Sequence, residues 1–178
     1  ALRNAQRHYF GYKQFRQGQE EIINEIMNKR PVLAVLPTGA GKSICFQLPS
    51  LLMDGITIVI SPLISLMKDQ AEALQAKGIG AAYLDSSLNN NEYGKILYDT
   101  LNGRVKFLYV APERLANQQF VAFAKRANIT LVAVDEAHCV SQWGHSFRKD
   151  YYNIPDFIAL LPKHPLVAAF TATATEEV

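Results

Sequence analysis

The feature that most constrains the fold is a regular alternation of short apolar segments with longer amphipathic ones. Five segments are rich in β-branched residues, too short for helices and mostly flanked by Gly, Pro or Asn: 32–36, 56–60, 106–110, 129–134 and 166–170. Residues 81–84 suggest a sixth. Continuously apolar strands that alternate with helices indicate a parallel sheet covered on both faces. The sequence therefore predicts an α/β domain, doubly wound, with a mostly parallel sheet and helices on both faces.

Amphipathic patterns between these segments predict the helices. Residues 19–29 place four apolar side chains on one face, and Lys29 and Arg30 follow at the end that favours cations. Residues 89–101 and 151–161 are further candidates. Each pattern is long enough for a helix that covers one face of the sheet.

One more helix is predicted from its boundary residues. Ser61 is expected to cap it, with Pro62 at the first helical position. Leu63 belongs to the apolar stripe that follows, and Gly78 supplies the stop.

Composition narrows the class of protein but not its partner. The 178 residues suit a single domain, and a net charge of +2 neither demands nor excludes a polyanion. Cys45, Cys139 and four scattered histidines form no zinc signature, and free thiols suit a reducing compartment. Residues 1–7 carry two arginines and no apolar run, so no signal peptide is expected, and no segment suits a membrane crossing. We expect a soluble intracellular protein, cytoplasmic in a bacterium or nuclear in a eukaryote.

The first predicted strand runs directly into a phosphate-binding sequence. The segment reads Pro37-Thr38-Gly39-Ala40-Gly41-Lys42-Ser43 and is followed by a helical pattern. Gly39 and Gly41 let backbone N–H groups turn towards phosphate oxygens, and the helix presents its positive end to the same anion. Lys42 is expected to reach the β- and γ-phosphates, and the Ser43 hydroxyl to bind Mg²⁺. These residues predict a P-loop.

A plainer interpretation of this segment is a Gly-rich turn that only connects a strand to a helix. Leu36 also stands where the common P-loop pattern begins with Gly. A Gly-Lys-Ser sequence at a helix start, directly after an apolar strand, favours the phosphate site.

Two adjacent carboxylates, Asp135 and Glu136, follow the predicted strand at 129–134. An acid at the end of a buried strand is where P-loop proteins hold Mg²⁺, so Asp135 is the expected metal residue and Glu136 the expected base for the attacking water. An acidic surface loop is the alternative, but the P-loop argues against it. His138 is assigned a coupling role only by its place after the acids.

Together these residues resemble superfamily 2 helicases, and the sequences around them resemble the RecQ family of DNA helicases. The matching segments run in family order from residue 10 to residue 175: 10–19, 61–70, 111–115, 141–148 and 170–175. The resemblance implies a RecA-like P-loop NTPase domain that spans residues 1–178. It also implies an ATP-dependent 3′–5′ DNA helicase of recombination and repair, with ATP and Mg²⁺ as cofactors.

The resemblance also implies an adenine site near the amino terminus. Tyr12 and Arg16 match the residues that stack on the base, and Gln19 matches the one that hydrogen-bonds its edge. An aromatic face and a guanidinium plane both stack on a base, which suits this assignment. Phe10 and Phe15 are expected to be core aromatics instead.

For DNA, the resemblance points first to an aromatic-rich loop that senses single strands and relays binding to ATP hydrolysis. Its candidate residues are Gln142, Trp143, His145, Phe147 and Arg148. Flat aromatic rings stack on bases and Arg148 suits a phosphate, although a tryptophan is often simply a core residue.

Two other segments carry expectations for DNA binding and coupling. Arg114 is the preferred phosphate contact, whereas Lys68 is expected to be a solvated helix residue. Thr171 and Thr173, placed after the last strand, resemble the motif that couples nucleotide state to domain movement. A plain Thr/Ala-rich turn is the competing interpretation.

The expected partners are single-stranded and partly duplex DNA and a second RecA-like domain of the same protein. That second domain lies outside this sequence, so the 178 residues alone are expected to bind ATP–Mg²⁺ weakly and to hydrolyse little of it. Three other functions stay open: an RNA-directed helicase, a P-loop kinase or small-molecule transferase, and a module that only binds nucleotide and DNA.

Overall fold

The structure, a computed structural model, describes residues 1–37, 41–140 and 149–172. Its elements follow one another along the chain as α1 (Leu2–Phe10), α2 (Gln19–Met27), β1 (Val32–Leu36), α3 (Lys42–Leu52), β2 (Ile56–Ile60), α4 (Ile64–Ala76), β3 (Ala81–Leu84), α5 (Asn90–Leu101), β4 (Phe107–Val110), η1 (Pro112–Ala116), α6 (Gln118–Arg126), β5 (Ile129–Val134), η2 (Ala137–Val140), η3 (Lys149–Tyr152), α7 (Asn153–Leu160) and β6 (Leu166–Ala172). The labels η1 to η3 denote short 3₁₀ helices.

The six strands form one sheet in the order β1-β6-β5-β2-β4-β3, and every neighbouring pair is parallel. All six predicted strands are present, which confirms the predicted fold class. Two boundaries differ. β4 begins at Phe107, one residue later than predicted, and the ammonium group of Lys106 donates to the carbonyl oxygen of Gly55 just before β2. β6 continues to Ala172, so Thr171 lies inside this strand and not after it.

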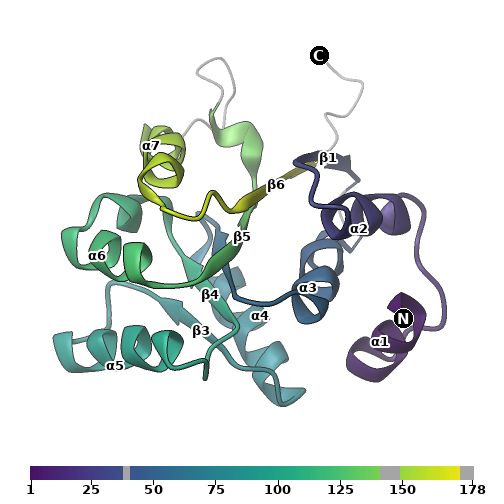
Figure 1. The fold of residues 1–178 in the computed structure, drawn as a ribbon, viewed down its shortest axis with the longest axis horizontal. Helices are drawn as coiled ribbons and strands as arrows, with labels where there is room; N and C mark the ends of the chain where they lie inside the picture. The colour runs from purple at the N-terminus through teal and green to yellow at the C-terminus, as the bar shows by residue number, and fades with distance from the viewer. Residues whose placement is uncertain (38–40, 141–148, 173–178) are drawn as a thin grey trace.

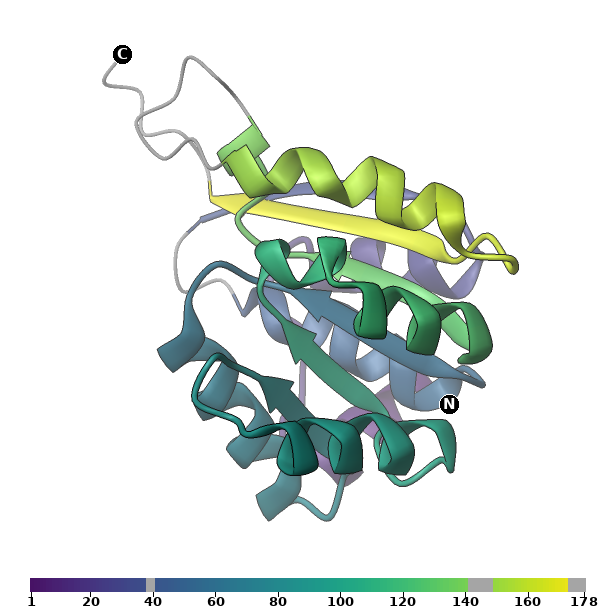
Figure 2. The same cartoon turned by 90° about the vertical axis from the view of Figure 1, so that its left-hand side faces the viewer.

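Helices cover both faces of the sheet, each over its own apolar core. Buried side chains of α2, α3 and α4 pack on one face, and those of α5, α6 and α7 pack on the other. Figure 1 shows the two groups on opposite sides of the sheet, and Figure 2 turns α5, α6 and α7 towards the viewer. Doubly wound sheets leave their carboxyl edge open for ligands, so a binding site is expected at that edge.

The outermost strand, β1, departs from the expectation that both faces are covered. Ala34 and Leu36 are buried, but Leu33 is 71% exposed and Val35 is 55% exposed. Among the described strands β1 pairs only with β6, and the helices of that face pack farther along the sheet. The prediction that a continuously apolar strand is covered on both faces is therefore wrong for this edge strand.

The predicted end of the helix at 19–29 was wrong. The helix predicted over 19–29 ends at Met27, because Lys29 adopts a left-handed conformation with φ 58°. The backbone N–H of Arg30 donates to the carbonyl oxygen of Glu25, and the Arg30 guanidinium pairs with the Glu25 carboxylate at 3.0 Å. These two cations lie beyond the helix and not in its last turn.

The helix predicted to begin at Ser61 and Pro62 begins instead at Ile64. Ser61 is buried, and its hydroxyl accepts a hydrogen bond from the backbone N–H of Leu63, so it closes a turn before the helix. Leu63 is 41% exposed and lies outside the apolar stripe. The stop at Gly78 is confirmed by its φ of 75° directly after the last turn.

Both cysteines are buried and neither forms a disulfide bond, and burial raises the pKa of Cys45 to about 12. Phe10 and Phe15 pack against the core of the α2–α4 face, as expected. None of the helices in the described ranges has the length and apolar character that a bilayer crossing requires.

Candidate nucleotide-binding site

Strand order explains why distant parts of the sequence meet. β6 lies between β1 and β5, so the carboxyl ends of these three strands are neighbours at one edge of the sheet. The P-loop sequence follows β1, the acidic pair follows β5, and Thr171 lies near the end of β6. Adjacent strands are about 4.8 Å apart, so a long side chain can cross from the β1 loop to the β5 loop.

The side chain of Lys42 makes that crossing. Its Nζ atom lies 3.5 Å from Oδ1 of Asp135 and 3.5 Å from Oε1 of Glu136. Lys42 is the first residue of α3, and Gly41 before it has a φ of 77°. The left-handed glycine lets the chain turn from β1 into the helix, which aims the lysine at the acids. Residues 93 positions apart thus form one charged cluster.

Burial controls the electrostatics of Asp135. Burial raises the pKa of this carboxyl, the positive charge of Lys42 lowers it, and the neighbouring Glu136 carboxylate raises it again. The Asp135 side chain is 12% exposed, against 22% for Glu136. A buried acid next to a lysine is an unfavourable arrangement for folding alone and a common one at functional sites.

We expect Asp135→Asn to stabilise the fold at neutral pH. A raised folded-state pKa means that the stability contributed by this carboxyl is present below its unfolded pKa and is lost as pH rises through the folded one. Asn removes the buried charge, so its melting temperature should exceed that of the wild type at neutral pH, and the gap should narrow on acidification. Thermal unfolding of both proteins, with a chelator present and from neutral to acidic pH, measures this difference in melting temperature.

The matched control is Asp69→Asn, which makes the same change at an exposed position on α4. It should leave the melting temperature nearly unchanged. A melting temperature of Asp135→Asn below that of the wild type at neutral pH would mean that pairing with Lys42 outweighs the cost of burial.

Glu136 is held in an unusual backbone conformation. Its φ is 54°, in the left-handed region that a residue with a side chain rarely adopts. The backbone N–H of Glu136 donates to Oδ1 of Asp135 at 2.9 Å, which ties the two acids together. Such strain costs about 1 kcal/mol or more and persists where the surroundings hold it, typically at functional sites.

His138 connects the acids to the end of β6. Its Nε2 atom lies 3.3 Å from Oε2 of Glu136, and its Nδ1 atom lies 2.8 Å from Oγ1 of Thr171. The two residues that the sequence linked to coupling are therefore in contact with each other. A change at Thr171 can reach Glu136 through a single ring.

The predicted adenine residues lie on the amino-terminal side of the P-loop. Gln19 is buried, accepts a hydrogen bond from the backbone N–H of Arg16 at 2.8 Å, and donates one to the carbonyl oxygen of Gly41 at 3.1 Å. Gln19 thus connects the segment before α2 to the P-loop. Tyr12 is 54% exposed, so its ring is accessible to a ligand.

The other predicted contacts are more dispersed. The guanidinium of Arg114 lies 5.1 Å from the ring centre of Tyr93, which fixes it over α5. Lys68 is exposed on α4, as expected. Several predicted residues lie outside the described part of the chain: Thr38, Gly39, Ala40, Gln142, Trp143, His145, Phe147, Arg148 and Thr173.

Sequence reasoning missed one residue of this site, Tyr151. It was treated only as the first residue of a helix, but it lies in η3 and its hydroxyl donates to the backbone oxygen of Asp135 at 2.7 Å. A tyrosine just before an amphipathic pattern is a weak signal, because the bond partner is a carbonyl that every residue possesses.

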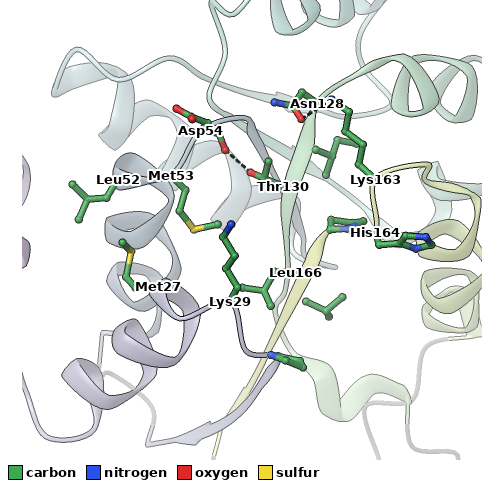
Figure 3. A pocket seen from close by; sticks show the side chains of 14 residues that line it. Met27, Lys29, Leu52, Met53, Asp54, Asn128, Thr130, Lys163, His164 and Leu166 are labelled. Atoms are coloured by element: carbon green, nitrogen blue, oxygen red, sulfur yellow. Dashed lines mark hydrogen bonds between the residues drawn. The ribbon is translucent and has the colours of Figure 1, made fainter.

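A cavity of about 850 Å³ lies at the opposite edge of the sheet. Figure 3 shows its lining, which includes Lys29 after α2, Met53 after α3, Thr130 in β5 and His164 before β6. The amino ends of the strands open here, away from Lys42 and the acids. The cavity is therefore separate from the charged cluster and has none of its residues.

Comparison with known proteins agrees with this geometry. A family model described as DEAD/DEAH box helicase matches residues 16–178. The ATP-dependent DNA helicase RecQ of Bacillus subtilis (strain 168) is 50% identical over 172 residues, which are 96% of this chain and 29% of the relative. RecQ of Haemophilus influenzae is 47% identical over 165 residues, or 93% of this chain and 26% of the relative. The chain thus spans less than a third of either relative.

Among solved structures, the helicase Lhr of Mycobacterium smegmatis bound to ssDNA and AMP-PNP superposes with a TM-score of 0.74. The match covers 97% of this chain and 25% of that one at 18% identity, so it supports the fold alone. The family model and the identity to the RecQ helicases go further: the chain belongs to the DEAD/DEAH box helicases and, within them, to the RecQ family.

Proposed function

We propose that this chain is the nucleotide-binding motor domain of a 3′–5′ DNA helicase of recombination and repair, in which ATP hydrolysis drives movement along single-stranded DNA. The observation that carries the proposal is the position of the Lys42 ammonium, 3.5 Å from both Asp135 and Glu136 at the edge where the P-loop sequence begins. Fold likeness alone would not support a function, because one fold hosts many.

The described residues suggest how hydrolysis proceeds. When the triphosphate enters, its anionic oxygens compete for Lys42, which then leaves the carboxylates and neutralises the β- and γ-phosphates. Release from Lys42 leaves Glu136 as a carboxylate able to accept a proton from the attacking water. His138 holds one oxygen of Glu136, so the other can face the water.

The donor set also fits magnesium. Mg²⁺ prefers oxygen ligands and is commonly held by one or two carboxylates together with substrate phosphates. Asp135 offers a mostly buried carboxylate 3.5 Å from Lys42, which offsets its charge, and Ser43 follows Lys42 in the first turn of α3. Bound Mg²⁺ would neutralise charge that develops on the phosphates, and Asp135 and Ser43 would hold it.

Adenine recognition is proposed for Tyr12, Arg16 and Gln19, and the phosphate cradle for the segment from Thr38 to Ser43. Gln19 supports both assignments because its amide already contacts Gly41 of that segment. A base bound beside Gln19 would therefore be sensed by the phosphate loop.

DNA binding and coupling are proposed for the loop residues from Gln142 to Arg148, for Arg114, and for Thr171 and Thr173. A second RecA-like domain is proposed to complete the ATP and DNA sites, since an arginine supplied from elsewhere accelerates phosphoryl transfer by about 10³ to 10⁵. Closure of the two domains over ATP and their parting after hydrolysis would then produce steps along the strand.

An RNA-directed helicase is the second candidate, because the phosphate and acid residues would be shared. The relatives of high identity are described as DNA helicases, which favours DNA. ATPase rates of the full-length protein with single-stranded DNA and RNA of the same sequence separate the two. Stronger stimulation by RNA would overturn the DNA assignment.

We expect Trp143→Ala, made in the full-length protein, to remove the response to DNA. Base–aromatic stacking is worth about 1–3 kcal/mol, so the DNA-stimulated ATPase rate should fall at least about fivefold, while ATP binding is retained. Steady-state ATPase with and without single-stranded DNA, together with nucleotide titration, measures both quantities.

Tyr98→Ala is the control, because it removes an exposed aromatic ring from α5, where Tyr98 is 61% exposed. Its DNA response should match that of the wild type. A Trp143→Ala protein with a full response to DNA would show that the sensor lies elsewhere.

A further inference from the structure

Tyr151 is buried next to the acidic pair, and the sequence around it does not predict this position. It lies in η3, which begins directly after the segment 141–148, and its side chain is 0% exposed. Its hydroxyl donates to the backbone oxygen of Asp135 at 2.7 Å. Burial raises the pKa of Tyr151, so the hydroxyl stays protonated and remains a donor.

The bond completes a set of contacts that fixes Asp135 from several elements. The backbone N–H of Asp135 donates to the carbonyl oxygen of Ile60 at 2.8 Å, which holds it to β2. Its carboxylate contacts Lys42 and accepts from the N–H of Glu136. Its own carbonyl oxygen has left the strand ladder and is held by Tyr151. The direction of this residue therefore depends on the position of η3.

η3 itself contacts the segments assigned to DNA and to coupling. It packs against η1, which contains Arg114, and against η2, which contains His138. Its chain continues from the predicted DNA-sensing loop. A short helix that packs against η1 and η2, and that holds the Asp135 carbonyl through the Tyr151 hydroxyl, is placed to transmit displacement to the acids.

We propose that Tyr151 is a positioning residue through which the segment after residue 148 sets the orientation of Asp135, and with it Glu136. The inference rests on the proposed function, because it concerns the hydrolysis that this site would perform. Tyr151 is buried and would touch neither nucleotide nor DNA. Its action would pass from its hydroxyl to the carbonyl acceptor of Asp135, and the same hydroxyl also contacts the side chain of Cys139 in η2.

The test is Tyr151→Phe in the full-length protein, which keeps the ring and removes only the donor. The DNA-stimulated kcat for ATP should fall about fivefold, the kinetic equivalent of one net hydrogen bond. KM for ATP and the DNA concentration for half-maximal stimulation should change less than about twofold, because no contact with either ligand is lost.

Thr57→Val is the matched control. Thr57 is a buried residue at the amino end of β2 whose hydroxyl donates to Ser50 Oγ at 2.8 Å, so the control also removes one buried hydroxyl bond. Its melting temperature should fall about as far as that of Tyr151→Phe, with kcat unchanged. Each variant is assayed well below its own melting temperature, so that loss of folded protein does not enter kcat.

The outcomes distinguish failure of the proposed function from failure of the positioning role of Tyr151. Wild-type protein without any DNA-stimulated ATPase would refute the proposed function itself. If stimulation is present, a kcat of Tyr151→Phe equal to that of Thr57→Val overturns the positioning role. A rise in the DNA concentration needed for stimulation overturns it too, since Tyr151 would then act on DNA binding.

Discussion

Replacement of Lys42 by alanine should reduce the ATPase rate of the full-length protein by about 10³-fold, the upper range for removal of one electrostatic contact from a transition state. Two effects combine. The phosphates lose the ammonium group that would neutralise them, and Asp135 and Glu136 lose the cation 3.5 Å from each. Two adjacent carboxylates without a counter-charge also repel the incoming triphosphate. Both kcat and nucleotide affinity should therefore fall.

Steady-state ATPase and fluorescent-nucleotide titration measure these losses. Lys68→Ala makes the same substitution at an exposed position of α4 and should leave both quantities unchanged. Activity of Lys42→Ala within about tenfold of the wild type would mean that another cation serves the phosphates, and the site would have to be reassigned.

Replacement of Glu136 by glutamine should lower kcat by about 10²- to 10⁴-fold, the range for loss of a general base. Glutamine has nearly the same shape and can still contact His138, but it cannot take a proton from water at neutral pH. Nucleotide affinity should be kept or should rise, because the change removes one negative charge next to the triphosphate site. This split between kcat and binding distinguishes a base from a binding residue.

Single-turnover hydrolysis and nucleotide titration of the full-length protein provide the measurement. Glu72→Gln, at an exposed position on α4, is the control for the same chemical change. A kcat within about tenfold of the wild type would exclude Glu136 as the base, whereas a parallel loss of affinity would assign it to binding.

Local patterns predicted the parts of the fold that depend on local chemistry. The strands were recognisable because short apolar runs without helical periodicity, bounded by turn residues, are typical of buried strands. The meeting of Lys42 with Asp135 followed from two motifs and from the rule that ligands gather at the carboxyl ends of parallel strands. These inferences need only the chain and the geometry that all such sheets share.

The failures have a common physical origin in tertiary contacts. Exposure of Leu33 depends on strand order, since the same apolar sequence would be buried at the centre of the sheet. Ser61 has the composition of a helix cap, yet its hydroxyl closes an earlier turn. Tyr151 depends on a bond to the Asp135 backbone, and backbone acceptors leave no trace in a sequence.

The exposed side chains of the edge strand β1 affect how these 178 residues would behave in solution by themselves. A strand that is hydrogen-bonded on one side among the described strands, with bare aliphatic groups at Leu33 and Val35, invites strand addition by a second molecule. We therefore expect concentrated samples to form intermolecular sheets, which light scattering would detect. Polar substitution at these two positions, whose side chains point away from the α2–α4 core, would improve solubility without disturbing the nucleotide site.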